Sequence, residues 1–249
     1  MPHKVYINMK KLLPLLLLVA VTSSSCRYMF GKRVRGNGNI RTEEHSVSSF
    51  KNVEVSGAIE LYVSQGDVKP VKIETDDNLL QYIEVIQEGD KIIIQSREGY
   101  NLRPTGKIKV YISAVVYNHI DVSGACSITG QNKIVNTEDL KLEVSGAGDI
   151  NMEVTAPSVS AEVSGAGSVN LKGETKNFDL ELTGASKAHC FDLLSEKTKV
   201  DISGAGDADV YASIKLDAEV SGAGSVAYKG AATSVSQHVS GAGSVKKVD

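Results

Sequence analysis

A short motif of small residues, SGAG or a close variant, constrains the fold of this chain more than any other feature. It begins at seven positions, and successive copies lie 22, 19, 19, 20, 18 and 19 residues apart. The copies begin at Ser123, Ser145, Ser164, Thr183, Ser203, Ser221 and Ser240. A shorter copy, SGA, begins at Ser56. Repetition at about this period is typical of a solenoid, in which each repeat stacks on its neighbour.

Between the motifs, apolar and polar residues alternate, as in Leu140, Leu142 and Val144. Alternation with period two indicates strands with one buried face. A helical or leucine-rich repeat needs a helical stripe or an LxxLxL signature, and neither is present. Each repeat is also too short for a four-stranded propeller blade. The sequence therefore predicts an all-β fold, a parallel β-helix (β-solenoid) with coils of about 19 residues.

The motif itself is interpreted as a corner of each coil and not as a ligand-binding site. Glycine tolerates the positive φ that a sharp turn requires. Stacking places equivalent corners about 4.8 Å apart, which leaves room only for small side chains. The serine that opens each motif is expected to bond neighbouring backbone or to stack as a column of hydroxyl groups.

The N-terminus carries the pattern of an export signal. The apolar run 12–21 follows Lys10 and Lys11 and is too short to cross a bilayer core of about 30 Å. Small residues then lead to Cys26, which resembles the lipobox of bacterial lipoproteins, and an ordinary cleaved signal with an incidental cysteine is the alternative. The predicted organisation is a lipoprotein signal peptide at 1–25, a tether at 26–45, and one β-helical domain at 46–249 with SGAG repeats from 123 onward.

Several of these features together resemble a known family. GlyAsnGlyAsn at 36–39, Phe50 and Val53 before ValSerGlyAla, GlnGlyAsp at 65–67 and the serial SGAG coils are similar to the head GIN domain family, described as putative auto-transporter adhesins. The resemblance covers nearly the whole mature chain. It implies a right-handed β-helix in a secreted protein or lipoprotein of the Bacteroidetes. It transfers no catalytic residues.

The residues after Cys26 bear on location. In the Bacteroidetes, lipoproteins sent to the cell surface often carry acidic residues just after the cysteine. Here the residues are Arg27, Tyr28, Met29 and Phe30. The resemblance therefore implies an outer-membrane lipoprotein that faces the periplasm, with the cell surface as the alternative.

Charge and cysteine placement limit the partners. The formal net charge is −3, and removal of 1–25 leaves 24 basic and 30 acidic residues, a balance of −6. Nucleic acid is not an expected partner, because phosphate binding needs clustered Lys and Arg. The histidines show no metal-ligand spacing, so neither a metal nor a cofactor is predicted. Cys126 and Cys190 fall three coils apart, about 14 Å along the stack, which predicts two free, buried thiols.

The sequence favours a non-enzymatic, adhesin-like protein that is held at the membrane through its N-terminal lipid and binds an envelope glycan or protein. The alternative is a polysaccharide-active β-helix enzyme, a lyase or hydrolase. Such sites need clustered carboxylates with basic partners. The pairs Asp76–Asp77 and Asp207–Asp209 lack a nearby His or Arg in the sequence, and acids in turns are expected to be solvated. At the last coil, Lys246 and Lys247 are placed to protect an open edge, and a homo-oligomer formed through that edge is the alternative.

One candidate binding feature is a column of acids two residues before each motif. The mature chain places there Glu54, Asp121, Glu143, Glu162, Glu181, Asp201, Glu219 and finally His238. An apolar residue follows each acid, so alternation turns the acids outward. Like charges about 4.8 Å apart raise one another's pKa or recruit cations. The column is thus either a solvated face relieved by Lys141 and Lys199, or a track for calcium or a cationic partner.

Overall fold

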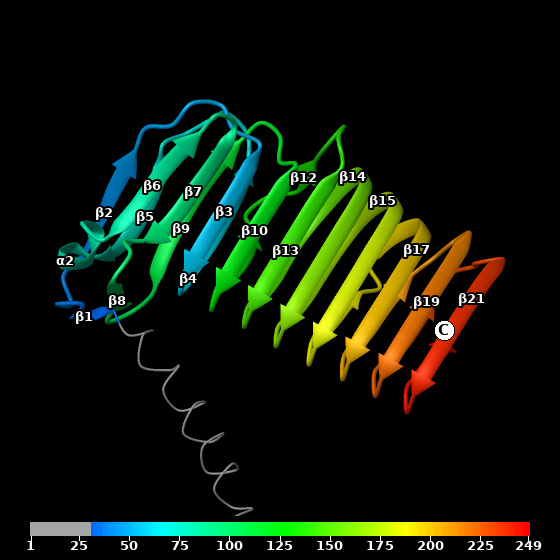
Figure 1. Ribbon diagram of the computed structural model, residues 1–249. Helices are drawn as coiled ribbons and strands as arrows, with labels where there is room; N and C mark the ends of the chain where they lie inside the picture. The colour runs from blue at the N-terminus through cyan, green and yellow to red at the C-terminus, as the bar shows by residue number, and fades with distance from the viewer. Residues whose placement is uncertain (1–30) are drawn as a thin grey trace, which may run out of the picture.

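The structure is a computed structural model that describes residues 31–249. The predicted signal peptide and Cys26 lie outside the described residues. The described chain is almost entirely strand, and its parallel coils stack into a β-solenoid of about seven turns spaced about 20 residues apart. Figure 1 shows the strands as a row of parallel arrows that runs from β3 to β21. The predicted all-β, β-helical fold is confirmed.

Each regular coil has two sides, and the first side ends at the SGAG motif. Its strands form the visible row in Figure 1. They are β3 (Asn52–Gly57), β10 (His119–Gly124), β13 (Leu140–Gly146), β14 (Asp149–Gly165), β15 (Ser168–Gly184), β17 (Leu193–Gly204), β19 (Lys215–Gly222) and β21 (Ser234–Gly241). All neighbours in this row pair in parallel, and the motif glycines face one another in register.

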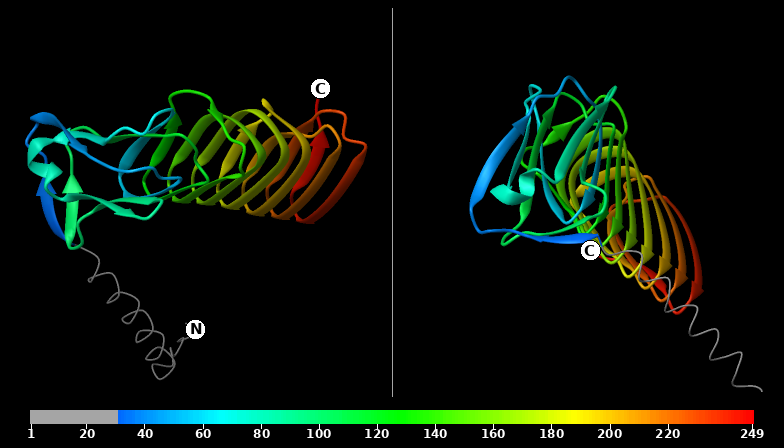
Figure 2. Two further views of the ribbon diagram at one scale, coloured as in Figure 1. Left: turned by 90° about the horizontal axis from the view of Figure 1, so that it is seen from above. Right: turned by 60° about the vertical axis from the view of Figure 1, so that its left-hand side comes forward.

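The second side follows the motif and closes the coil. Its strands are β4 (Ile59–Gln65), β11 (Ser127–Gly130), β12 (Ile134–Val135), β16 (Lys187–Cys190), β18 (Asp207–Tyr211), β20 (Ser225–Lys229) and β22 (Ser244–Lys247). The long strands β14 and β15 run along the second side of one coil, bend, and continue as the first side of the next. Figure 2 shows the coils from above as a series of nested arches.

The corner between the two sides is built from backbone. Gly165 has φ +127°, and a Cβ atom there would lie 2.2 Å from the carbonyl oxygen of Gly146 in the preceding coil. The next residue, Ala166, donates its N–H to that same oxygen at 2.9 Å. The hydrogen-bond ladder therefore continues through the turn, which only a residue without a side chain permits. The corner interpretation of the motif is correct.

The N-terminal end is less regular. Its elements are β1 (Lys32–Arg35), β2 (Ile40–His45), β5 (Val71–Asp76), α2 (Asp77–Leu80), β6 (Ile83–Glu88), β7 (Lys91–Ser96), β8 (Tyr100–Arg103) and β9 (Ile108–Ala114). Antiparallel pairs β2–β5, β5–β9 and β6–β7 are combined here with parallel pairs β3–β7 and β4–β9. Through β3 and β4 this end joins the coils, so one apolar core runs along the described chain.

The tether prediction is wrong for the part of 26–45 that the structure describes. β1 pairs in parallel with β8, and β2 pairs antiparallel with β5. Most of β2 is exposed, so its sequence carries no buried alternation. It is a strand because its backbone bonds to a sheet edge, and hydrophobic periodicity does not detect that kind of pairing.

The other end of the stack is open. Among residues 31–249, β21 pairs only with β19 and β22 only with β20, and every residue of β21 is exposed. Lys246 and Lys247 lie exposed on β22, where the sequence places protective charges.

Candidate functional site

The outward face of the first side carries the predicted acid column. Register pairs Glu54 with Asp121 and continues, one coil at a time, through Glu143, Glu162, Glu181, Asp201 and Glu219 to His238. All five residues singled out by sequence, Glu143, Glu162, Glu181, Asp201 and Glu219, therefore lie in one line. We call this line the acid column.

The column faces outward because the residues beside it are buried. Val144, Val163 and Ile202 follow three of its acids and expose 2%, 2% and 0% of their surface. Since successive side chains of a strand point to opposite faces, burial of these positions turns each acid to the exterior. The alternation of apolar and polar residues in the sequence therefore predicts by itself which side chains of these strands point outward.

A second column of hydroxyl groups runs beside the acids. It consists of the first residue of each motif, and pairs Ser56, Ser123, Ser145, Ser164, Thr183, Ser203, Ser221 and Ser240 in order. Between the two columns lies a shallow groove of about 140 Å³, lined by Glu143, Glu162 and Glu181 together with Ser145, Ser164 and Thr183. The groove therefore presents carboxylate oxygens from the acid column and hydroxyl oxygens from the second column.

Three of the four acids in the N-terminal half of the acid column, Glu54, Glu143 and Glu162, have a basic partner, whereas Asp121 has none within 4 Å among residues 31–249. Lys141 Nζ lies 2.9 Å from a carboxylate oxygen of Glu143 and 2.9 Å from one of Glu162. His119 also contacts Glu143, and Lys91 contacts Glu54. The two carboxylates that bond Lys141 raise the pKa of its ammonium group well above the usual value. The prediction that Lys141 relieves the column is confirmed.

The C-terminal half is not neutralised in the same way. Within residues 31–249, no Lys, Arg or His nitrogen lies within 4 Å of a carboxylate oxygen of Glu181, Asp201 or Glu219. Lys199 is in register with Asp179 and Asp217, one column away, and makes no such contact either. Lys199, unlike Lys141, therefore makes no ion pair with the acid column, and its relief of the column stays a prediction.

The predicted rise in carboxylate pKa occurs at one place and is reversed at another. Burial raises the pKa of Asp121, and the neighbouring charges of Glu143 and Glu54 add to that rise. At Glu143 burial acts in the same direction, but the hydrogen bond from Lys141 and the contact with His119 outweigh it and lower the pKa. Whether the pKa of a carboxylate is raised or lowered therefore depends on whether a cation contacts that carboxylate, and not on its place in the acid column.

The two acid pairs that the sequence assigned to turns differ from that expectation. Asp76 is fully buried and accepts hydrogen bonds from Gly38 N at 2.6 Å, Thr105 N at 2.9 Å and Thr105 Oγ1 at 2.8 Å. Burial acts to raise its pKa, but these bonds outweigh it and the pKa lies below the usual value. Asp76 is structural, because its carboxylate joins the 36–39 loop to the loop after β8.

Both pairs have a basic neighbour in the fold, and in the first pair Arg41 Nε lies 3.8 Å from Asp77 Oδ2. Asp209 Oδ2 lies 3.0 Å from His189 Nδ1 on the next coil of the second side. Sequence spacing does not show this contact, since the residues are 20 apart. Among the described residues, no group of three or more His, Cys, Asp and Glu side chains is arranged to hold a metal ion.

Sequence reasoning missed a hollow on the coils. A groove of about 540 Å³ follows the bends between second and first sides, lined in part by Pro157, Thr175, Leu194 and Tyr211. The bends vary in length and composition, so no repeated signal marks them. Cys126 and Cys190, by contrast, are free and buried as predicted, and burial raises the pKa of the Cys190 thiol to about 12.

Comparison with known proteins identifies the family. The family model described as "Putative auto-transporter adhesin, head GIN domain" matches residues 49–232. The chain belongs to this family. No curated protein matches the chain. Within residues 31–249, no helix has the length and apolar character needed to span a membrane.

Several solved structures share the fold of this chain. A putative adhesin from Bacteroides fragilis has a TM-score of 0.81 at 22% identity, covering 86% of this chain and 100% of its own. A putative lipid binding protein from Parabacteroides distasonis has a TM-score of 0.72 at 24% identity, covering 88% of this chain and 100% of its own. A putative adhesin from Parabacteroides merdae has a TM-score of 0.67 at 20% identity, with 88% and 100% coverage. At these identities the likeness establishes the fold.

Proposed function

We propose that this head GIN protein is a non-enzymatic, lipid-anchored component of the cell envelope that binds a glycan or protein partner on its first side. The observation that carries the proposal is the pairing of an acid column with a hydroxyl column, in register over successive coils. Membership of an adhesin family and the names of the similar structures support the adhesin-like part.

The face suits a repetitive partner. Strands stacked about 4.8 Å apart repeat the same acceptors along the solenoid. These acceptors sit on a rigid, fully hydrogen-bonded sheet, so little conformational freedom is lost on binding. The unneutralised acids Glu181, Asp201 and Glu219 lie at the half that is open to a cationic or hydroxyl-rich ligand. A glycan chain or a basic extended segment supplies donors of that kind.

Binding and turnover are tested together with a panel of envelope and dietary glycans. We expect retention of a subset of glycans without new reducing ends or unsaturated products. The variant Glu181→Gln/Asp201→Asn is expected to weaken binding at least tenfold. The matched control Asp207→Asn/Asp209→Asn removes two charges from the second side and leaves binding unchanged. Turnover of any glycan supports the enzyme alternative and overturns the proposal.

The anchor is tested at Cys26. Wild-type protein is expected to partition into detergent, whereas Cys26→Ala remains soluble or uncleaved in the cell envelope. Identical fractionation of the two forms contradicts lipidation. Protease treatment of intact cells then separates a periplasm-facing protein, which is protected, from one displayed at the surface, which is cleaved.

The open edge at β21 and β22 is the place where a second copy of the chain pairs if the protein is a homo-oligomer. Light scattering of the processed protein over a range of concentrations measures this directly. A mass that rises with concentration supports pairing through this edge, and a constant monomer mass excludes it.

A further inference from the structure

The N-terminal end of the molecule carries a small sheet that stands apart from the solenoid. It consists of β1 and β8 alone, paired in parallel. The register places Lys32 opposite Tyr100 and Arg35 opposite Arg103. Backbone bonds fix it at both ends, from Lys32 N to Gly99 O at 2.6 Å and from Gly36 N to Arg103 O at 2.9 Å.

This small sheet concentrates positive charge. Arg33 and Arg35 lie two residues apart and so project to the same face of β1, and Arg103 stands directly across from Arg35. Together with Gly36, Pro104 and Thr105 the three arginines line a hollow of about 590 Å³. Like charges directly opposite each other in a sheet are destabilising. We call the exposed cations Lys32, Arg33, Arg35 and Arg103 the basic ribbon.

Within residues 31–249, none of the four basic-ribbon side chains has a carboxylate oxygen within 4 Å. Other cations do have one: Arg41 lies 3.8 Å from Asp77, Lys51 2.8 Å from Glu138 and Lys107 2.9 Å from Glu60. The buried Asp76 lies behind Gly36 and is already satisfied by donors from Gly38 and Thr105. The basic ribbon is therefore an uncompensated site for an anion.

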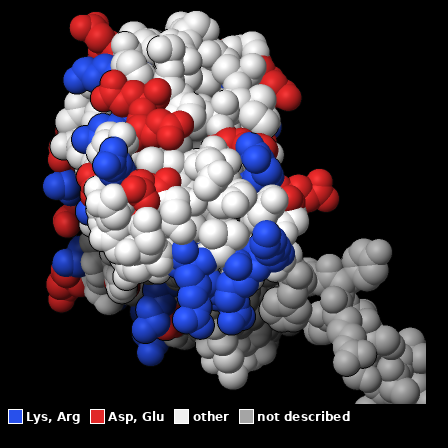
Figure 3. Space-filling view, turned by 90° about the vertical axis from the view of Figure 1, so that its left-hand side faces the viewer, with Lys and Arg blue, Asp and Glu red and all other residues white. Residues whose placement is uncertain are grey.

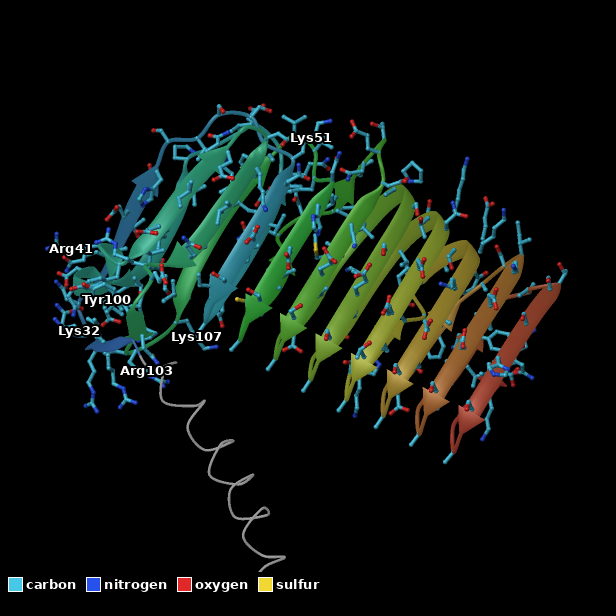
Figure 4. The ribbon with its side chains drawn as sticks, viewed as in Figure 1. Lys32, Arg41, Lys51, Tyr100, Arg103 and Lys107 are labelled. Carbon is cyan, nitrogen blue, oxygen red and sulfur yellow. The ribbon has the colours of Figure 1, made fainter. Side chains whose placement is uncertain are left out.

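Its position relates it to the predicted anchor. Figure 3 looks onto the N-terminal end, where Lys and Arg atoms gather along the lower edge, and Figure 4 places Lys32 and Arg103 at that corner. Lys32 follows Cys26 by six residues. Six residues span at most about 20 Å in any conformation. A lipid on Cys26 thus holds the basic ribbon within reach of the membrane surface.

We propose that the basic ribbon docks on the anionic headgroups of the membrane to which the protein is anchored, and so sets the direction in which the solenoid projects. The bidentate geometry of guanidinium groups matches phosphate oxygens. Charge complementarity and the short reach from Cys26 favour a lipid surface over a soluble anion. The docking is independent of the acid column, which lies on the first side of the coils.

The test uses the processed chain, residues 26–249, with Cys26→Ser so that no acyl chain contributes. Its partition is measured by co-sedimentation with vesicles of phosphatidylcholine alone and of an equimolar mixture with phosphatidylglycerol. We expect binding only to the anionic vesicles. Arg33→Gln/Arg35→Gln is expected to lower the partition coefficient about 25-fold, since each cation near an anionic surface contributes about fivefold.

The matched control is Lys197→Gln/Lys199→Gln, which also removes two exposed cations two residues apart on one strand, β17, but in the middle of the stack. It is expected to bind anionic vesicles as the parent does. If both double variants lose binding to anionic vesicles equally, the binding depends only on net charge, and the proposal is overturned. Direct binding of millimolar inorganic phosphate, measured by calorimetry, without any vesicle binding assigns the hollow to a soluble anion and also overturns the proposal.

The vesicle experiment tests the docking surface separately from the lipidation of Cys26. If Cys26→Ala leaves detergent partition unchanged while the Arg33→Gln/Arg35→Gln variant still loses vesicle binding, the anchor is wrong and the docking surface stands. If lipidation is found and both double variants bind vesicles alike, the anchor stands and the docking surface is wrong. Circular dichroism of each variant checks that the fold is unchanged.

Discussion

The regular coils and the N-terminal end are held together by different kinds of contact. In the coils one backbone contact recurs at each corner, where the N–H of the motif alanine bonds the glycine carbonyl of the preceding coil. At the N-terminal end each connection has its own side chain. Asp76 joins two loops, and Gln87 bonds both the backbone N–H and the hydroxyl group of Ser48.

This difference shows which parts of the coils and of the N-terminal end can vary in sequence and length. A repeated corner excludes side chains, so the coils vary at their bends and outward positions while the corners stay uniform. An end held by individual side chains tolerates irregular loops and accumulates local charge, as the basic ribbon does. The four predictions that follow test this contrast, from the largest expected effect to the smallest.

The corner glycine of a central coil is expected to be indispensable. Gly165→Ala places a Cβ atom 2.2 Å from the Gly146 carbonyl oxygen at φ +127°. The backbone must move and a hydrogen bond between coils is lost, so we expect a loss of more than about 3 kcal/mol in the free energy of unfolding. Urea unfolding followed by circular dichroism measures it.

The control lies at the N-terminal end. Gly38 also has positive φ, +83°, but a Cβ atom there meets nothing within 4 Å. Gly38→Ala is therefore expected to lose only about 1–2 kcal/mol, the conformational strain alone. Equal losses at Gly165 and Gly38 would contradict the claim that close packing of corners distinguishes the coils.

The same contrast explains what the sequence predicts and what it does not. The coils repeat, so the motif spacing and the alternation of residues such as Leu142 and Val144 define strands, corners and the acid column before any coordinates. The end does not repeat. Pairing of β2 at an exposed edge and burial of Asp76 depend on contacts between residues about 30 to 40 apart, which local pattern does not encode. Arg33 and Arg35 do alternate about Val34, and that was the one local signal for the basic ribbon.

Removal of the Asp76 carboxylate is expected to loosen the N-terminal end while the coils persist. Asp76→Ala leaves two backbone donors and one hydroxyl group without their acceptor, which corresponds to a loss of about 3 kcal/mol. Because the folded pKa is below the usual 3.8, this carboxylate stabilises the protein at higher pH, and its contribution disappears as pH falls through the folded pKa. Hydrogen exchange at pH 7 and pH 3 is the measurement.

Asp76→Asn provides the matched control, since it keeps the shape and removes the charge. Its stability is expected to vary less with pH in the acid range than that of the parent. Loss of protection that spreads evenly to β17 and β19 would show that the end and the coils unfold as one unit, contrary to the comparison.

Within the coils, Glu143 is expected to stabilise. It accepts a hydrogen bond from Lys141 and contacts His119, and its side chain is 25% exposed. Glu143→Gln removes these charge-assisted contacts and is expected to destabilise the protein by about 1 kcal/mol at pH 7. The lowered folded pKa means that this difference shrinks as pH falls through the acid range. Thermal melts of the variant and parent at pH 7 and pH 4 measure it.

The smallest expected effect is a gain in stability, and it concerns Asp121 on the coil before that of Glu143. Asp121 is paired in register with Glu54 on one side and Glu143 on the other. Its folded pKa is raised by burial and by those two charges, so its ionised form destabilises the fold increasingly as pH rises through that pKa. Asp121→Asn is therefore expected to stabilise the protein by about 0.5 kcal/mol at pH 7, since like charges directly opposite one another in a sheet are unfavourable. In thermal melts the gain is expected to shrink as pH falls through the raised folded pKa, because the parent loses its charge at this position. A variant less stable than the parent at pH 7 would show that Asp121 makes a favourable contact instead.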